Sequence, residues 1–432
     1  MTMRRYLYLI FCMTAISLFC CSCSNNTKEV KSIPSQKSEN KEESAENNTT
    51  DTHISEDDLE KGYSLPVSDQ ENEEAERDSF QIMEEISHIY KCADKGESLN
   101  AVLDENSMRK MVRKIKKQGY PVRNYEEYSN MENYKTVDLF LKEAQKGNKG
   151  SIVIYEVHSD GSIGREKFIY DGDCMFLVAS NGVWDDNNNP GMAYVSYTRL
   201  KKWRYSNKGW FCYELCVPEY PEVTEMVDGS CLVRIKPISS RKRELSKKCV
   251  REWGYQGNNF LCSNWDKNHM KKIDFNGLYE YLYAMKYKKK FNGKKYPNGI
   301  PKEQFEQLIM EYMPVPAEEI QKYAVYNKKK KAYDWMRLEC FNYAPNFFGT
   351  SIPEVTNVKH NLDGTMTLTV DAVCEMVLCN EAVITHELTV KFAKDGSFKY
   401  LGNKILNNGI EEIPPINTVF VKDDVVRRAD NK

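Results

Sequence analysis

Residues 151–170 read SIVIYEVHSDGSIGREKFIY, and they mark the point where the periodicity of the chain changes from helical to extended. Ile152–Tyr155 and Lys167–Tyr170 are rich in the apolar, β-branched and aromatic residues that strands favour. Asp160-Gly161 between them is a dipeptide typical of a tight hairpin. The spacing therefore predicts an antiparallel meander that begins near Ser151.

The same reasoning extends the meander toward the C-terminus and places helices before it. Further strands are predicted over Cys174–Ala179, Ala193–Tyr197, Gly209–Cys216 and Cys231–Ile235, with hairpins at Asp171-Gly172 and Asp228-Gly229. Apolar residues recur at helical spacing in two preceding segments, and a third helix is predicted over Tyr125–Lys146. These residues are Phe80, Met83, Ile86, Ile89 and Ala93, after a cap at Asp78 or Ser79, and then Met108, Met111, Val112 and Ile115.

The second half of the chain repeats this order of elements. Helices are predicted over Leu278–Met285, after Pro301 and after Pro316, where proline suits the first turn. The strands that follow are Tyr333–Phe341, Val355–His360, Met366–Val373, Ala382–Phe392 and Phe398–Ile405. The fold class is therefore α+β, with two helix-then-antiparallel-sheet units. Their element order resembles that of NTF2-like (cystatin-like) cones.

The first 23 residues, MTMRRYLYLIFCMTAISLFCCSC, have the features of a lipoprotein signal peptide. Arg4 and Arg5 precede an apolar run, Leu7–Phe19, that is too short to span a bilayer comfortably. Cysteines lie where a signal peptidase would cut. Cys23, preceded by the small Ser22, is the preferred site of lipid attachment, and Cys21 is the alternative. The leader predicts a lipid-anchored protein on the extracytoplasmic face of the cell membrane.

Composition sets the remaining boundaries. Ser24–Ser79 contains 16 acidic and six basic residues and almost no large apolar side chains, which favours a disordered acidic tether. The predicted domains are a signal peptide over 1–23, the tether over 24–78, a first α+β domain over 79–238, a connection over 239–272 and a second α+β domain over 273–432. The body carries a mildly positive charge, which together with export argues against nucleic acid as a partner.

No motif in the chain identifies a catalytic set. No histidine lies at ligand spacing from another, no G-x-S-x-G, P-loop or H-E-x-x-H occurs, and no C-x-x-C occurs after the leader. Thr385-His386-Glu387 does not form a local pair, because neighbours on a strand point to opposite faces. The acidic loop Asn181–Gly191 lacks the spacing of a calcium loop. We assign no catalytic residue, metal or cofactor.

Aromatic strand residues are the candidates for ligand contact, with core packing as the alternative for each. They are Trp203, Tyr205, Trp210, Tyr213 and Trp335. A basic loop, Lys288–Lys290 with Lys294 and Lys295, is a further candidate for contact with wall polymers or lipid head groups, with simple solvation as its alternative.

Three segments resemble a family of uncharacterised lipoproteins from clostridia and related Firmicutes. They are FNGLYEYLYAMKY at 275–287 with YPNGIPKEQFEQLIMEYMPVPAEEIQKYA at 296–324, Asn342–Pro345, and Phe398–Lys404. The resemblance implies no activity.

These observations predict an anchored extracytoplasmic lipoprotein that binds a ligand or acts as a scaffold. Its partners would be the membrane, through the N-terminal lipid, and an envelope protein or an anionic wall polymer. The alternative is a hydrolase or isomerase-like enzyme with an acid–base site in a cone-shaped pocket.

Overall fold

The computed structural model describes residues 55–97, 101–225, 227–255, 258–271, 273–334, 351–374 and 382–407. Contacts divide the chain into two compact units. Of the described residues, the N-terminal unit holds those up to Trp203 together with Glu214–Gly229, and the C-terminal unit holds Arg204–Tyr213 and those from Ser230 onward. The predicted mixture of helices and antiparallel sheet is confirmed.

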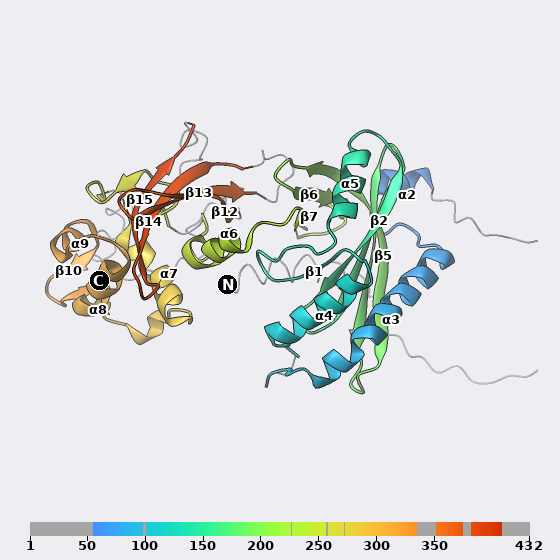
Figure 1. The fold of residues 1–432 in the computed structure, drawn as a ribbon, viewed down its shortest axis with the longest axis horizontal. Coiled ribbons are helices and arrows are strands. Elements are labelled where there is room, and N and C mark those ends of the chain that lie inside the picture. Colours follow the sequence, from blue (N-terminus) through green and yellow to red (C-terminus); the bar gives the residue numbers. More distant parts are fainter. Residues whose placement is uncertain are drawn as a thin grey trace, which may run out of the picture. The chain divides into compact units, whose positions relative to one another are not determined.

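The largest sheet is curled and has seven strands in the order β1 to β7 (Figure 1). β1 (Val122–Asn124) runs parallel to β2, and β2 to β5 pair antiparallel in succession. The other strands are β2 (Gly150–Val157), β3 (Ile163–Tyr170), β4 (Met175–Trp184), β5 (Pro190–Tyr205), β6 (Trp210–Leu215) and β7 (Ser230–Arg234). The meander predicted from Ser151 is therefore confirmed.

Two of the three predicted hairpin turns in this sheet are present. Gly161 and Gly172 have φ of 81° and 104°, a region that glycine enters without steric cost. The turn predicted at Asp228-Gly229 is wrong, because the connection from β6 to β7 runs from Cys216 to Gly229. A Cβ atom on Gly229 would lie 2.6 Å from the Leu215 carbonyl oxygen, so this glycine permits close backbone approach and does not make a tight turn.

Helix α3 (Asp69–Cys92) begins about three turns before the predicted cap at Asp78 or Ser79. Its N-cap is Ser68, whose hydroxyl accepts a hydrogen bond from the Glu71 amide at 3.2 Å. The short helix α2 (Glu56–Lys61) precedes it. The prediction of a tether through residue 78 is thus wrong for these two helical segments, and residues before 55 lie outside the described part of the chain.

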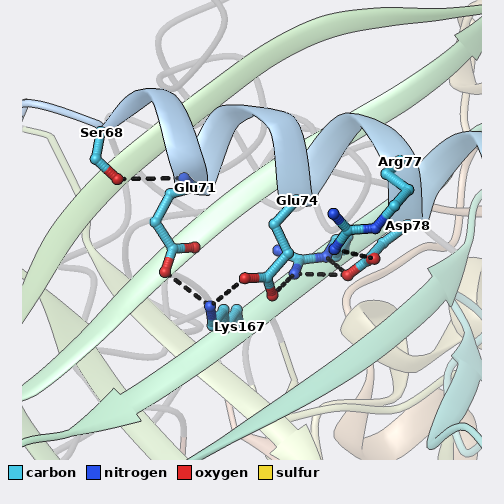
Figure 2. A network of polar contacts seen from close by, with 7 residues as sticks. Ser68, Glu71, Glu74, Arg77, Asp78 and Lys167 are labelled. Carbon is cyan, nitrogen blue, oxygen red and sulfur yellow. Dashed lines mark hydrogen bonds and ion pairs between the residues drawn. The ribbon is translucent and has the colours of Figure 1, made fainter. Parts of the chain in front are cut away.

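Ion pairs explain why the acidic start of α3 is helical (Figure 2). Arg165 of β3 is fully buried, and its Nη2 lies 2.8 Å from both Glu74 and Asp78. Lys167, two residues along the same strand, places Nζ 2.7 Å from Glu71 and 2.9 Å from Glu74. The acidic composition of this segment favours a solvated tether. In the structure, however, its carboxylates neutralise two cations of the sheet, Arg165 and Lys167.

The pKa of Glu74 reflects this arrangement. Burial alone would raise the pKa of this carboxyl, but the hydrogen bonds and charges of Lys167 and Arg165 lower it below its usual value. A carboxylate with a lowered folded-state pKa stabilises the fold at neutral pH, and this stabilisation is lost as the pH falls through that pKa.

C-terminal to the ion-paired residues, α3 packs through an apolar face. Ile82, Met83 and Ile86 join Met111 and Ile115 of α4 (Glu105–Lys117) in one buried cluster. Figure 1 shows α3 and α4 running along one side of the sheet. Helix α5 (Lys135–Ala144) is shorter than the predicted Tyr125–Lys146.

The C-terminal unit contains three of the helices expected from the sequence. α7 (Phe275–Tyr287) is confirmed, and Pro301 and Pro316 directly precede α8 (Lys302–Tyr312) and α9 (Ala317–Tyr323), as predicted. The remaining helical segments are α6 (Ser240–Leu245), the π-helical turn η1 (Ser246–Val250) and the 3₁₀ turn η2 (Gly293–Lys295).

Two sheets complete this unit. The five-stranded sheet has the order β12-β13-β14-β15-β8 and is antiparallel throughout. Its strands are β12 (Ile352–His360), β13 (Met366–Val373), β14 (Thr385–Phe392), β15 (Phe398–Ile405) and β8 (Trp265–Asp266). A small sheet joins β10 (Tyr326–Asn327), β11 (Ala332–Tyr333) and β9 (Ile300–Pro301). The predicted strand Tyr333–Phe341 is β11 at its start, and residues 335–341 lie outside the described chain.

The core of the C-terminal unit is aromatic. Trp253 stacks on Phe260 at 4.1 Å, and its indole N–H donates to the Tyr400 hydroxyl at 2.8 Å. That hydroxyl in turn donates to the Cys249 carbonyl at 2.7 Å, so the polar atoms of Trp253 and Tyr400 are satisfied inside the core.

Among the residues that the structure describes, no helix is long and apolar enough to cross a bilayer.

Replacing Arg165 tests the role of the ion pairs. Arg165→Met leaves Asp78 and Glu74 partly buried without this guanidinium, and we expect a loss of about 3–5 kcal/mol in the free energy of unfolding. The matched control is Arg77→Met, because Arg77 also approaches Asp78 but from an exposed side chain. It should cost no more than about 0.5 kcal/mol. Urea unfolding measures both, and equal losses in the two variants would contradict the assignment.

Candidate functional site

The predicted aromatic contacts are largely interior. Tyr205, Trp210 and Tyr213 are only 6%, 6% and 2% exposed. Trp203 is half-buried and meets Tyr170 edge-on at 6.0 Å. Trp335, like Cys21 and Cys23, lies outside the described residues. Ligand binding by these side chains stays a prediction, and the described rings pack against their own chain.

Two buried carboxylates face each other across β12 and β13. Glu354 pairs in register with Asp371, and the two are 2% and 1% exposed. Each already has a cation: Arg234 Nη2 lies 3.2 Å from Glu354, and Lys208 Nζ lies 2.5 Å from Asp371. Burial raises the pKa of Glu354 to about 7, although Arg234 opposes the shift. The pair thus holds the segments around Lys208 and Arg234 against β12 and β13.

His386 is a buried neutral side chain. Its Nε2 lies 2.9 Å from the Tyr255 hydroxyl, and its Nδ1 lies 2.6 Å from Asn403 Oδ1. Burial lowers the pKa of His386 to about 4, against the opposing effects of Asn403 and Asp371. Asn403 also donates to the carbonyls of Leu261 and Ser263, so the histidine belongs to an internal network.

A second cluster of titratable groups lies on β1 to β3, and the sequence analysis did not find it. Arg123 Nη2 approaches Glu156 at 2.5 Å and Glu166 at 3.4 Å. A Cβ atom on Gly164 would lie 2.7 Å from His158 Nε2, so the imidazole crosses the strand at this glycine. The available signal was a glycine inside a strand, which often marks such an approach.

Electrostatics in this β1–β3 cluster favour the protonated form of Glu166. Burial raises the pKa of Glu166, the nearby charge of Glu156 adds to the rise, and Arg123 opposes it. However, both carboxylates share Arg123 as their partner. Within the described ranges, no group of three or more His, Cys, Asp or Glu side chains is placed to hold a metal ion.

The C-terminal unit also exposes aromatic rings beside lysines. Tyr283 and Tyr287, one turn apart on α7, have ring centroids 4.5 Å apart. Tyr283 meets Phe291 at 5.3 Å, and Phe291 stacks on Tyr296 at 5.3 Å. Tyr287 is 44% exposed, and the other three rings are half-buried. We call these four rings, with Lys288–Lys290, Lys294 and Lys295, the aromatic–lysine surface.

A buried stack supports this surface from beneath. Tyr279 meets Phe291 edge-on at 5.2 Å and stacks on Phe305 at 5.1 Å, and Phe305 stacks on Tyr333 at 4.0 Å. Tyr279, Phe305 and Tyr333 are fully buried. The exposed rings are therefore held by packing and by a hydrogen bond from Gln304 to the Tyr296 hydroxyl.

The charge of the aromatic–lysine surface is one-sided. Residues 281–299 contain six lysines and no Asp or Glu. Lys286 pairs with Glu311 at 2.5 Å. No described carboxylate lies within ion-pair distance of the other five lysines, all of which are exposed. The surface can thus offer several cations together with apolar ring faces.

Together these features describe a mixed α+β protein whose interior polar clusters are internally paired and whose C-terminal unit displays an aromatic, cationic surface. The family model described as "Family of unknown function (DUF6070)" matches residues 72–418. Because the match covers most of the sequence, the chain belongs to this family. The expected membership in an uncharacterised family is confirmed to that extent. Neither the curated proteins nor the solved structures include a significant match.

The internal role of His386 predicts a pH dependence of stability. Its folded-state pKa of about 4 lies below the usual value of 6.5, so only the unfolded chain binds a proton between these values. Stability is therefore full above pH 6.5 and falls toward pH 4, by about 1.4 kcal/mol per pH unit from this group. His386→Gln should remove this part of the slope in urea unfolding.

The matched control is His360→Gln, because His360 is exposed at the end of β12. Its slope should equal that of the unchanged chain. An unaltered slope in His386→Gln would contradict the buried, neutral histidine.

Proposed function

We propose that this protein is a lipid-anchored lipoprotein of the extracytoplasmic membrane face that binds an envelope component through its outer surface. The observation that carries the proposal is that the interior is filled by the protein's own side chains, whose charged groups are already paired. The predicted contact residues Tyr205, Trp210 and Tyr213 are buried, and the interior carboxylates Glu354 and Asp371 are already paired with cations. A partner then meets the protein from outside.

The anchor in this proposal is supported by the leader. Arg4 and Arg5, the short apolar run and the cysteines at its end form one pattern, and a long polar segment follows it. A polar segment of this length lets a folded body stand away from the membrane surface. Cys23 is the proposed attachment residue, with Cys21 as the alternative.

We also propose that the two helix-and-sheet arrangements are filled versions of the NTF2-like cone. Support comes from the element order and from α3 and α4 packing on one side of a curled sheet. In such a filled cone the mouth is closed by the protein's own side chains. The hydrolase or isomerase alternative would need an open pocket with convergent acid and base groups.

Metabolic labelling with a fatty-acid analogue tests the anchor. The unchanged chain should take up the label, and the Cys21→Ala/Cys23→Ala double variant should lose it. Each single variant identifies the attachment residue, and Cys12→Ala is the matched leader control that should keep the label. An unlabelled wild type, or a fully labelled double variant, would refute the anchor.

Cross-linking in the native membrane tests the interaction. The proposal expects a defined envelope component to be recovered with the protein. Recovery of the protein alone at high yield would count against an interaction role.

A further inference from the structure

We infer that the aromatic–lysine surface binds a phosphate-bearing polymer, with the lysines on the phosphates and the rings against the repeating units between them. This inference rests on the proposed function and names the class of its ligand. It requires a ligand that is anionic at intervals and carries uncharged sugar or polyol units between the charges.

Charge carries the first step. Lys288–Lys290, Lys294 and Lys295 lie within eight consecutive residues that contain no acid, and no described carboxylate forms an ion pair with them. Lysine is a compact point charge with three donors, which suits phosphate oxygens approached from several directions. Lys288 lies close enough to Glu252 for its charge to help lower the pKa of that carboxyl, and the other four cations repel one another, a repulsion that a polyanion relieves.

Backbone geometry keeps these lysines together. Lys288 ends α7 in the left-handed conformation, with φ of 53°, and its N–H donates to the Ala284 carbonyl at 2.9 Å. Asn292 caps the next turn, because its side chain accepts a hydrogen bond from the Lys294 amide at 3.1 Å. The two groups of lysines therefore lie on either side of Phe291, on a segment held at both ends.

The rings carry the second step. Tyr287, Tyr283, Phe291 and Tyr296 form a continuous row with centroid separations of 4.5, 5.3 and 5.3 Å. Their support on the Tyr279–Phe305–Tyr333 stack means that little side-chain order has to be created on binding. Rigid aromatic faces next to donors favour the ring and polyol units of a glycopolymer over a uniformly charged chain.

A membrane surface fits the same charge less well. The apolar face of α7, with Leu278, Leu282 and Met285, is buried in the core and cannot insert into lipid. The exposed rings of the surface are mainly tyrosines, whose hydroxyls prefer water or a polar ligand. The ligand of this surface is therefore the phosphate-bearing polymer and not a lipid surface.

The experiment measures binding of the full chain to poly(glycerol phosphate) by fluorescence titration at increasing salt. We expect binding that weakens with salt, because each phosphate contact releases counterions. Lys288→Gln/Lys289→Gln/Lys290→Gln should weaken it about tenfold or more, as expected for three charge contacts of about 0.5 kcal/mol each. Tyr287→Ala should also weaken binding, and Tyr287→Phe should restore it.

The matched control removes the same charge elsewhere. Lys328→Gln/Lys329→Gln/Lys330→Gln lies in the exposed hairpin between β10 and β11 and should bind within about twofold of the unchanged chain. The two lysine variants should show the same urea unfolding curve as the unchanged chain, because every substituted lysine side chain is exposed.

Several outcomes would overturn the inference. They are no binding to poly(glycerol phosphate), equal weakening in both lysine variants, equal binding of neutral dextran, and tighter binding to phosphatidylglycerol vesicles than to the polymer. Fatty-acid labelling on Cys21 or Cys23 together with absent polymer binding would reject the ligand class and leave the anchor standing. Absence of labelling would instead reject the proposed function itself.

Discussion

The ion pairs of Arg165 are the constraint on which the N-terminal unit depends. A guanidinium with no exposed surface is costly to bury unless carboxylates neutralise it, and here Glu74 and Asp78 do so from α3. Lys167 adds Glu71 to the same arrangement. The helix must therefore lie along β3, which brings Ile82, Met83 and Ile86 onto the apolar cluster with α4. Charge fixes where the helix lies, and apolar packing supplies most of its stability.

The C-terminal unit uses polar pairing in a similar way. Lys208 lies in the turn between β5 and β6, Arg234 is the last residue of β7, and they neutralise Asp371 and Glu354 of the five-stranded sheet. Trp210 and Cys212 then pack with Val373 in a small apolar cluster. As a consequence, the aromatic strand residues Tyr205 and Trp210 are buried. The charged groups that could otherwise form a site are paired with one another. The aromatic–lysine surface is the complementary feature on the outside of this unit.

Local features of the fold were predictable from the sequence, and long-range ones were not. Alternation and Asp-Gly turns place β2 to β5, because strand period and hairpin geometry are properties of short segments. The start of α3 was missed because the partner of Glu74 and Asp78 is Arg165, far along the chain, and composition alone makes that segment look solvated. Trp210 was correctly placed on a strand, but its burial depends on Val373 of β13, a contact that is distant in the sequence. The lysines were visible as a basic loop, whereas the stack of Tyr279, Phe305 and Tyr333 beneath their neighbouring rings required the fold.

The central claim is that this family member meets its partner on the outside of the C-terminal unit. Hydrogen exchange of the full chain, with and without poly(glycerol phosphate), tests it most directly, because it reports protection segment by segment. The account predicts slower exchange within residues 286–296 when the polymer is present, with β6 and β7 unchanged. Slower exchange around Trp210 and Tyr213, with none in residues 286–296, would contradict it and place the ligand in the interior.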